Sequence, residues 1–360
     1  MYCNKFHIAL GICCVFIGSL AGVAQAQMVE FKYEGTKQYG KPIAWDSSTL
    51  LLLSRDGRAY HFPIGKISEL TQLKNRFAAV SQSEMRALLL AEHGNRFQVS
   101  GTGHYLVVHP AGEGEKWSQR FEQIYRSVHA YVSTRGFRPS NPEFPLVAIV
   151  LSDRTEFETY SRRLNVEVAE GTVGYYHPLS NRIVVYDQTG ADGTSRTWLD
   201  NADTIIHETA HQAAHNFALH SRFAQNPAWF VEGFATMFEA PGVWNPAQYR
   251  QRHDRINQYQ LASFRKYILD TKRTGWLPEL IGSDRSFQSE PFAAYSAAWA
   301  LSFYLSESEA GNYFSYMKTL SHLPTATAYP STARLNDFEE HFGTDLRMLE
   351  SRVIQFVEKL

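Results

Sequence analysis

Two histidines, His207 and His211, constrain this 360-residue chain more than any other feature. They belong to the run TIIHETAHQ at residues 204–212. An α-helix turns once every 3.6 residues, so two imidazoles four residues apart project from one face and can bind the same metal ion. Glu208 lies about 100° around the helix from His207. It therefore flanks the ion without binding it and is placed to act as a general base.

A third ligand must come from elsewhere, and the sequence offers His215, Glu232 and Glu239. His215 lies about 12 Å along the helix from the first motif histidine, so we interpret it as a core or supporting residue. A short helix is predicted over residues 227–239, between two prolines, with Glu232 at its centre. Glu232 is the predicted third ligand. Glu239, roughly 10 Å further along, either orients a histidine, shapes the cleft or is a solvated helix-end carboxylate.

Cysteine usage agrees with these ligands. Cys3, Cys13 and Cys14 are the three cysteines, and all lie within residues 1–26. We predict a signal peptide there, cleaved near Ala26, because an apolar run over residues 8–23 precedes a small-x-small site. A single-span anchor is the alternative, but the run is short and contains three glycines. The mature chain then has no thiolate, and its predicted location is periplasmic or secreted, without stable membrane insertion.

The remainder is predicted to be an α+β protein. Residues 27–95 form a small β-rich segment plus a helix, with a hairpin turn at 55–58; a structural appendage is the preferred role and a pro-segment the alternative. Residues 96–360 form the predicted catalytic domain: a mixed sheet over 96–200, active-site helices over 201–240 and a helical part over 241–360, including one long helix over 247–271. The net charge of −1 and the absence of basic runs argue against a nucleic-acid partner.

The motifs also carry a family resemblance. HETAH at residues 207–211, followed by WFVEGFA at 229–235, resembles the gluzincins, zinc metallopeptidases of the peptidase MA-like superfamily, and especially their aminopeptidase-like branch. The sequence is most similar to uncharacterised bacterial secreted proteins with HExxHQ and a later Tyr-x-x-x-Trp-Ala-Leu, matched here at 295–301. The resemblance covers roughly residues 146–360. The three-histidine metzincin class is excluded, because Ala214 and Phe217 stand where that class has Gly and His.

This resemblance implies a zincin-like fold with one Zn²⁺ per chain, held by His207, His211 and Glu232, and Glu208 as base. It also suggests Tyr295 as the hydroxyl that stabilises the tetrahedral oxyanion, and core packing is the competing role for this tyrosine.

The expected activity is that of a metallopeptidase acting on peptide or protein substrates. A clear segment for gripping a free amine is not found, so the endopeptidase and exopeptidase modes both stay open. Two other functions compete with this one. The first is a binding or scaffold protein on a gluzincin-like fold, and the second is a zinc hydrolase of a non-peptide amide in the cell envelope.

Overall fold

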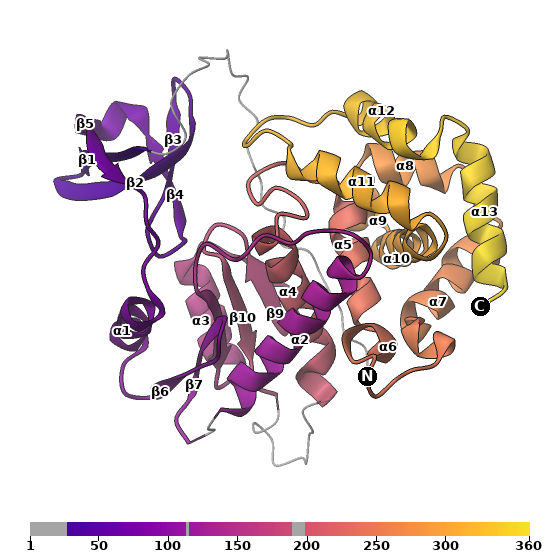
Figure 1. Cartoon of the computed structure of the whole chain (residues 1–360), viewed down its shortest axis with the longest axis horizontal. Coiled ribbons are helices and arrows are strands. Elements are labelled where there is room, and N and C mark those ends of the chain that lie inside the picture. Colours follow the sequence, from indigo (N-terminus) through magenta and orange to yellow (C-terminus); the bar gives the residue numbers. More distant parts are fainter. Residues whose placement is uncertain (1–26, 113–114, 189–198) are drawn as a thin grey trace.

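The computed structural model describes residues 27–112, 115–188 and 199–360, with side chains from residue 202 in the last range. The predicted leader, residues 1–26, lies outside these ranges. Five antiparallel strands form a first sheet in the order β4-β3-β2-β1-β5, seen at the upper left of Figure 1. The strands are β1 (Gln27–Tyr33), β2 (Thr36–Trp45), β3 (Thr49–Leu53), β4 (Ala59–Pro63) and β5 (Ile67–Arg76).

Successive side chains of β3 and β4 point to opposite faces of the first sheet, and both faces bury apolar residues. Phe31, Leu50 and Phe62 face one buried cluster, while Leu51, Leu53 and Ala59 point to the opposite side and pack in a second cluster with Phe144. The predicted turn joins β3 to β4 and is closed by a hydrogen bond from the Ser54 amide to the Arg58 carbonyl (2.7 Å). Gly57 supplies the positive φ (+83°) that this turn needs. The expectation of a β-rich N-terminal segment is confirmed.

A second, mixed sheet positions the candidate site. Its order is β6-β7-β8-β10-β9. The three inner strands run parallel, whereas β6 and β9 lie antiparallel at the two edges. Every residue of β8 is buried, as an apolar central strand requires. The strands are β6 (Phe97–Gly101), β7 (Tyr105–Pro110), β8 (Leu146–Leu151), β9 (Gly174–His177) and β10 (Arg182–Tyr186).

Helices cover both faces of the second sheet (Figure 1). α2 (Lys116–Ser133) and α4 (Leu199–Asn216) pack on one face. α1 (Gln82–His93) and α3 (Arg154–Arg163) pack on the other, where Met85 and Leu89 join the strand side chains. α1 therefore contacts the second sheet, although it follows directly on the first.

The chain from residue 228 onward is helical wherever it has regular structure, which confirms the predicted α+β class with a helical C-terminal part. The predicted long helix over 247–271 is wrong. Asn257 starts a new helix by accepting a hydrogen bond from the Gln260 amide (3.1 Å), and the turns after α7 widen into a π-helix. The helices are α5 (Ala228–Phe238), α6 (Pro241–Trp244), α7 (Gln258–Phe264), α8 (Trp276–Gly282), α9 (Ser286–Ser289), α10 (Pro291–Ser308), α11 (Ala310–Ser321), α12 (Ser331–Phe342) and α13 (Leu346–Glu358).

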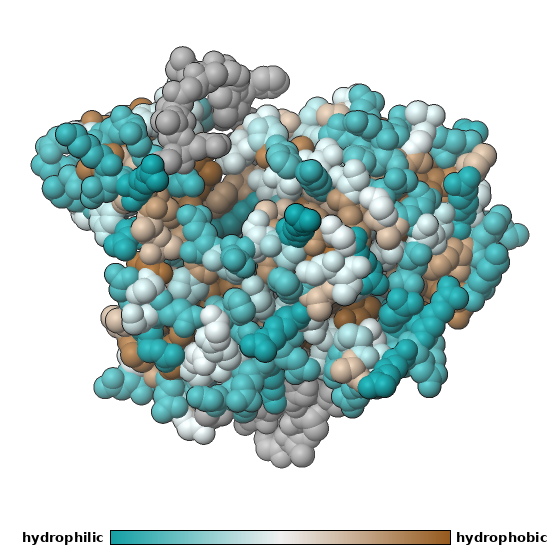
Figure 2. Space-filling view, viewed as in Figure 1, coloured by the Kyte–Doolittle hydropathy of each residue, from teal (hydrophilic) through white to brown (hydrophobic). Residues whose placement is uncertain are grey.

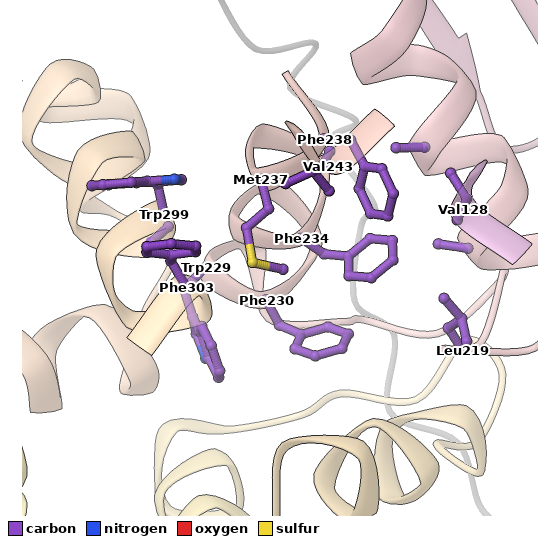
Figure 3. Close-up of a cluster of buried hydrophobic side chains, with 14 of the residues drawn as sticks. Val128, Leu219, Trp229, Phe230, Phe234, Met237, Phe238, Val243, Trp299 and Phe303 are labelled. Carbon is purple, nitrogen blue, oxygen red and sulfur yellow. The ribbon is translucent and has the colours of Figure 1, made fainter. Parts of the chain in front are cut away.

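α5 lies at the centre of the largest core. Phe230, Phe234 and Phe238 point from one side of α5 toward Val128 and Leu219 (Figure 3). The opposite side of α5 packs on α10. With apolar contacts on two sides, α5 has no freedom to rotate, so any polar side chain that it carries is held in one direction.

On the face drawn in Figure 2, the surface is hollowed between the first sheet and the C-terminal helices. Within the described ranges, none of the helices combines the length and the apolar character needed to cross a bilayer.

Candidate metal centre

A buried amide fixes α4 on the second sheet. Gln212 directly follows the second motif histidine and is fully buried. Its Oε1 accepts a hydrogen bond from the Tyr105 hydroxyl (2.7 Å), and its Nε2 donates to the carbonyls of Val147 (3.1 Å) and Asn181 (2.7 Å). These bonds set the rotation of α4 about its axis. They reach distant parts of the chain, so the sequence motif alone could not reveal this role.

Three predicted ligand atoms converge. His207 Nε2 lies 2.9 Å from His211 Nε2 and 3.2 Å from Glu232 Oε2, and the third side of the triangle measures 3.6 Å. Tetrahedral ligands bound at 2.0–2.1 Å stand about 3.3 Å apart, and the three distances bracket that value. All three side chains are largely buried. This group can hold a metal ion.

Glu239 takes the orienting role, which was one of the alternatives for it. Its Oε1 lies 2.8 Å from His207 Nδ1. A histidine that donates its Nδ1 proton to a carboxylate keeps Nε2 unprotonated and available to a metal. The Glu239 side chain is only 9% exposed, so water competes little for this hydrogen bond. Glu239 thus aims His207 at the other two ligands.

Glu208 lies between the ligand helix and the edge of the second sheet. Its Oε2 accepts a hydrogen bond from the Tyr176 amide of β9 (2.7 Å). The close approach of β9 to α4 depends on Gly174, because a Cβ there would lie 3.0 Å from the Thr204 methyl group and closer still to Val185. The predicted base is therefore held by backbone, beside an edge strand.

Tyr295 reaches the same site from α10. Burial raises the pKa of Tyr295 well above its ordinary value, and the nearby carboxylates of Glu232, Glu208 and Glu239 raise it further, together with a hydrogen bond to Glu232. The hydroxyl is consequently a proton donor throughout the physiological pH range. Both catalytic residues predicted from sequence are thus placed beside the predicted ligands.

His215 lies apart from the metal-binding group among the described residues. Its ring stacks on Tyr176 (5.4 Å between centroids) and contacts His220 (4.3 Å). Burial lowers the pKa of His215 well below its usual value and that of His220 to about 3. Both imidazoles are neutral at physiological pH and pack against each other at the C-terminal end of α4. His220 belongs to no recognisable motif, so its place beside His215 could not be predicted from the sequence.

Comparison with known proteins adds one match. The model of a family described as "Protein of unknown function (DUF1570)" matches residues 201–326. The matched range runs from within α4 to the residues after α11, and it includes His207, Glu208, His211, Glu232, Glu239 and Tyr295 but none of the strands of the second sheet. No curated protein matches the chain.

Proposed function

We propose that this protein is a zinc-dependent hydrolase that cleaves peptide bonds. The observation that carries the proposal is the convergence of His207, His211 and Glu232, with ligand atoms 2.9 to 3.6 Å apart, beside Glu208. Two imidazoles and a carboxylate are a donor set of catalytic zinc sites, which keep a fourth position open. Zn²⁺ held there would supply a Lewis acid for the substrate carbonyl and for the attacking water.

The side chains around the ligands match the roles that hydrolysis requires. Glu208 accepts a proton from the attacking water and passes it to the leaving amine. Its contact with the Tyr176 amide orients one carboxylate oxygen and so sets the direction of the other. Tyr295, protonated and buried at the site, donates to the oxygen on which negative charge develops.

The edge strand supports a peptide as substrate. The Val173 carbonyl accepts from the Tyr186 amide of β10, whereas the Tyr176 amide points to Glu208. Alternate backbone groups of an antiparallel strand face opposite sides, so those of Gly174 and Tyr176 face the site. An extended peptide can add to such an edge with its scissile bond beside the base. A small non-peptide amide would make no use of this strand.

The sequence supports the same conclusion from a different direction. The resemblance of residues 207–211 and 229–235 to gluzincins supplies the same three ligands and the same base. The apolar run over residues 8–23 and the lack of cysteine beyond residue 14 favour an exported protein. A binding or scaffold protein has no need of a base held beside the ligands, so we place that alternative second.

One variant tests both metal binding and hydrolysis. Glu208→Gln keeps the size of the side chain and removes its basicity, so we expect wild-type metal content and a fall in kcat of about 10²–10⁴-fold. Metal analysis of the purified protein and cleavage profiling on a diverse peptide library provide the two measurements. The library also separates endopeptidase from exopeptidase action.

Glu340→Gln is the matched control, because Glu340 is exposed on α12 and remote from the site. We expect it to behave as wild type in both measurements. A wild-type protein that binds no zinc would contradict the proposed function. Full activity in Glu208→Gln would instead remove Glu208 from the role of base.

A further inference from the structure

The side chain of Asn257 connects the start of α7 to Glu239, the carboxylate that contacts His207. Asn257 directly precedes α7 and is buried, with 6% of its surface exposed. Its Nδ2 donates to Glu239 Oε2 (2.9 Å) and to the Thr236 carbonyl (3.0 Å). Its Oδ1 accepts from the Gln260 amide (3.1 Å). Both amide protons and the amide oxygen of Asn257 therefore have partners.

These partners allow only one orientation of the Asn257 amide. Turning it by 180° would set Oδ1 against the Glu239 carboxylate and the Thr236 carbonyl, which are both acceptors. The same turn would set the NH₂ group against the Gln260 amide, which is a donor. The donor side of Asn257 consequently faces Glu239.

Glu239 is held from both ends as a result. One carboxylate oxygen bonds to His207 Nδ1, and the other accepts from Asn257. We propose that Asn257 is a positioning residue for metal binding: it fixes the carboxylate that aims His207 Nε2 at the other two ligands. This inference rests on the proposed metal site and adds to it a residue that lies outside the ligand helices.

The identity of the residue at 257 distinguishes this role from simple helix capping. Aspartate caps a helix as well as asparagine does. Asp153 and Asp345 start α3 and α13 in this chain by the same contact to the third residue of the helix. An aspartate at 257 would also cap α7, but it would place a carboxylate against Glu239. Only the amide combines the cap with a donor to Glu239.

Asn257→Asp therefore separates the two roles. The cap on α7 stays, the donor to Glu239 becomes an acceptor, and Glu239 loses its preferred orientation. We expect zinc affinity, measured by competition with a chromogenic chelator, to fall about 10–100-fold. The absorption spectrum of the Co²⁺-loaded protein should change as well, since the ligand geometry around His207 changes. Asp345→Asn, which alters the remote cap of α13, should leave both measurements as in wild type.

A second variant provides the rescue. In Asn257→Asp/Glu239→Gln the donor and the acceptor of this hydrogen bond change places, so the amide at 239 donates to the carboxylate at 257. The oxygen of the amide at 239 still accepts from His207 Nδ1. We expect the double variant to bind zinc more tightly than Asn257→Asp does, a non-additive result that marks a direct coupling between the two positions. Thermal unfolding of each variant without metal separates loss of fold from loss of affinity.

The outcomes distinguish the two proposals. A wild-type protein without zinc affinity would overturn the metal site itself. Wild-type affinity in a folded Asn257→Asp protein would overturn the inference and leave the site intact. If Asn257→Asp fails to fold, the double variant decides: a folded double variant with wild-type affinity supports the coupling, and one that is folded but without measurable affinity contradicts it.

Discussion

Tyr295 is present at the candidate site as a neutral hydroxyl. Burial and the carboxylates of Glu232, Glu208 and Glu239 all disfavour the phenolate, and they raise the pKa of Tyr295 well above its ordinary value. A protonated phenol can donate a hydrogen bond to an oxygen that gains negative charge, and this contact is stronger in the transition state than in the ground state. Tyr295 is therefore expected to affect turnover more than metal binding.

Tyr295→Phe tests this expectation. Loss of one donor to the oxyanion should lower kcat by about 10²–10³-fold, while metal content stays at the wild-type level because no ligand is removed. Steady-state peptide cleavage and metal analysis provide the two values. Tyr304→Phe is the control, since Tyr304 lies on the same helix and its hydroxyl also donates to a carboxylate, that of Glu309 (3.2 Å). An unchanged kcat in Tyr295→Phe would show that this tyrosine only packs in the core and does not stabilise the oxyanion.

Sequence reasoning found the site residues whose spacing is local. His207 and His211 follow from one helical turn, and Glu232 from a short helix between prolines. The residues that orient them were not predictable in the same way. Gln212 and Asn257 act through contacts with β7, β8 and α5, and those contacts exist only after the chain has folded. Glu239 stayed undecided for the same reason.

At the scale of elements, the contact between α5 and α10 holds Glu232 and Tyr295 together. Gly233 follows Glu232, the predicted third ligand, and faces α10 without a side chain. A Cβ at this position would lie 2.9 Å from the Ala298 carbonyl carbon and still closer to its oxygen and to Ser302 Oγ. The Ser302 hydroxyl could rotate away, but the Ala298 carbonyl is backbone and can make room only if α10 itself shifts.

Gly233→Ala is expected to destabilise the protein by about 1–3 kcal/mol, since the added methyl group forces the two helices apart. It should also weaken zinc binding, because Glu232 moves with α5. Thermal unfolding and chelator competition measure the two effects. Gly311→Ala in α11 is the matched control: its Cβ meets nothing within 4 Å, and the higher helix propensity of alanine should leave stability equal or raised. A Gly233→Ala protein as stable as wild type would contradict the close packing described here.

Secondary-structure elements were predictable where the local sequence pattern was strong. The buried run 146–151 became β8, and the hairpin at 55–58 became the β3–β4 turn. The helix predicted over 247–271 failed because its apolar spacing continues across Asn257, where a side-chain cap starts a separate helix. The α5–α10 contact was also beyond prediction, since Gly233 shows its role only when the partner helix is in place.

At the scale of the whole molecule, Arg222 joins the first sheet to the edge of the second. It is partly buried, and all its hydrogen bonds among the described residues go to carbonyl groups. Nε donates to Pro178 (2.6 Å), and Nη2 donates to Gly57 (2.7 Å) and Leu179 (3.0 Å). The β3–β4 turn is thereby fixed to the turn that follows β9. For the predicted segment 27–95, this contact of its first sheet favours a permanent appendage over a removable pro-segment.

His177 makes this junction sensitive to acid. Burial lowers the pKa of His177 from 6.5 to about 4, helped by the charges of Arg222 and Arg182. Below pH 6.5, His177 therefore binds a proton in the unfolded chain, whereas in the folded protein it stays neutral down to about pH 4. The contribution of neutral His177 to the free energy of unfolding is fully present above pH 6.5. It falls as the pH drops from 6.5 to about 4, by up to about 1.4 kcal/mol per pH unit.

His177→Gln should consequently reduce the loss of stability between pH 7 and pH 5, as measured by chemical denaturation at the two values. The replacement cannot gain a charge, so the folded and unfolded states bind equal numbers of protons at this position. Replacement of the exposed His322 by glutamine is the control and should keep the wild-type dependence. An identical dependence in wild type and His177→Gln would contradict the role given to this histidine.

The close contact at Gly233 also affects the geometry of the candidate site. His207 and His211 belong to α4, which Gln212 holds on the second sheet, while Glu232 and Tyr295 belong to α5 and α10, which pack closely at Gly233. The candidate site is therefore assembled from two parts of the same core, α4 on the second sheet and the α5–α10 pair. The distances between His207, His211 and Glu232 depend on how α5 packs against α4, so a shift of the C-terminal helices relative to the second sheet would change the geometry of the predicted metal-binding group.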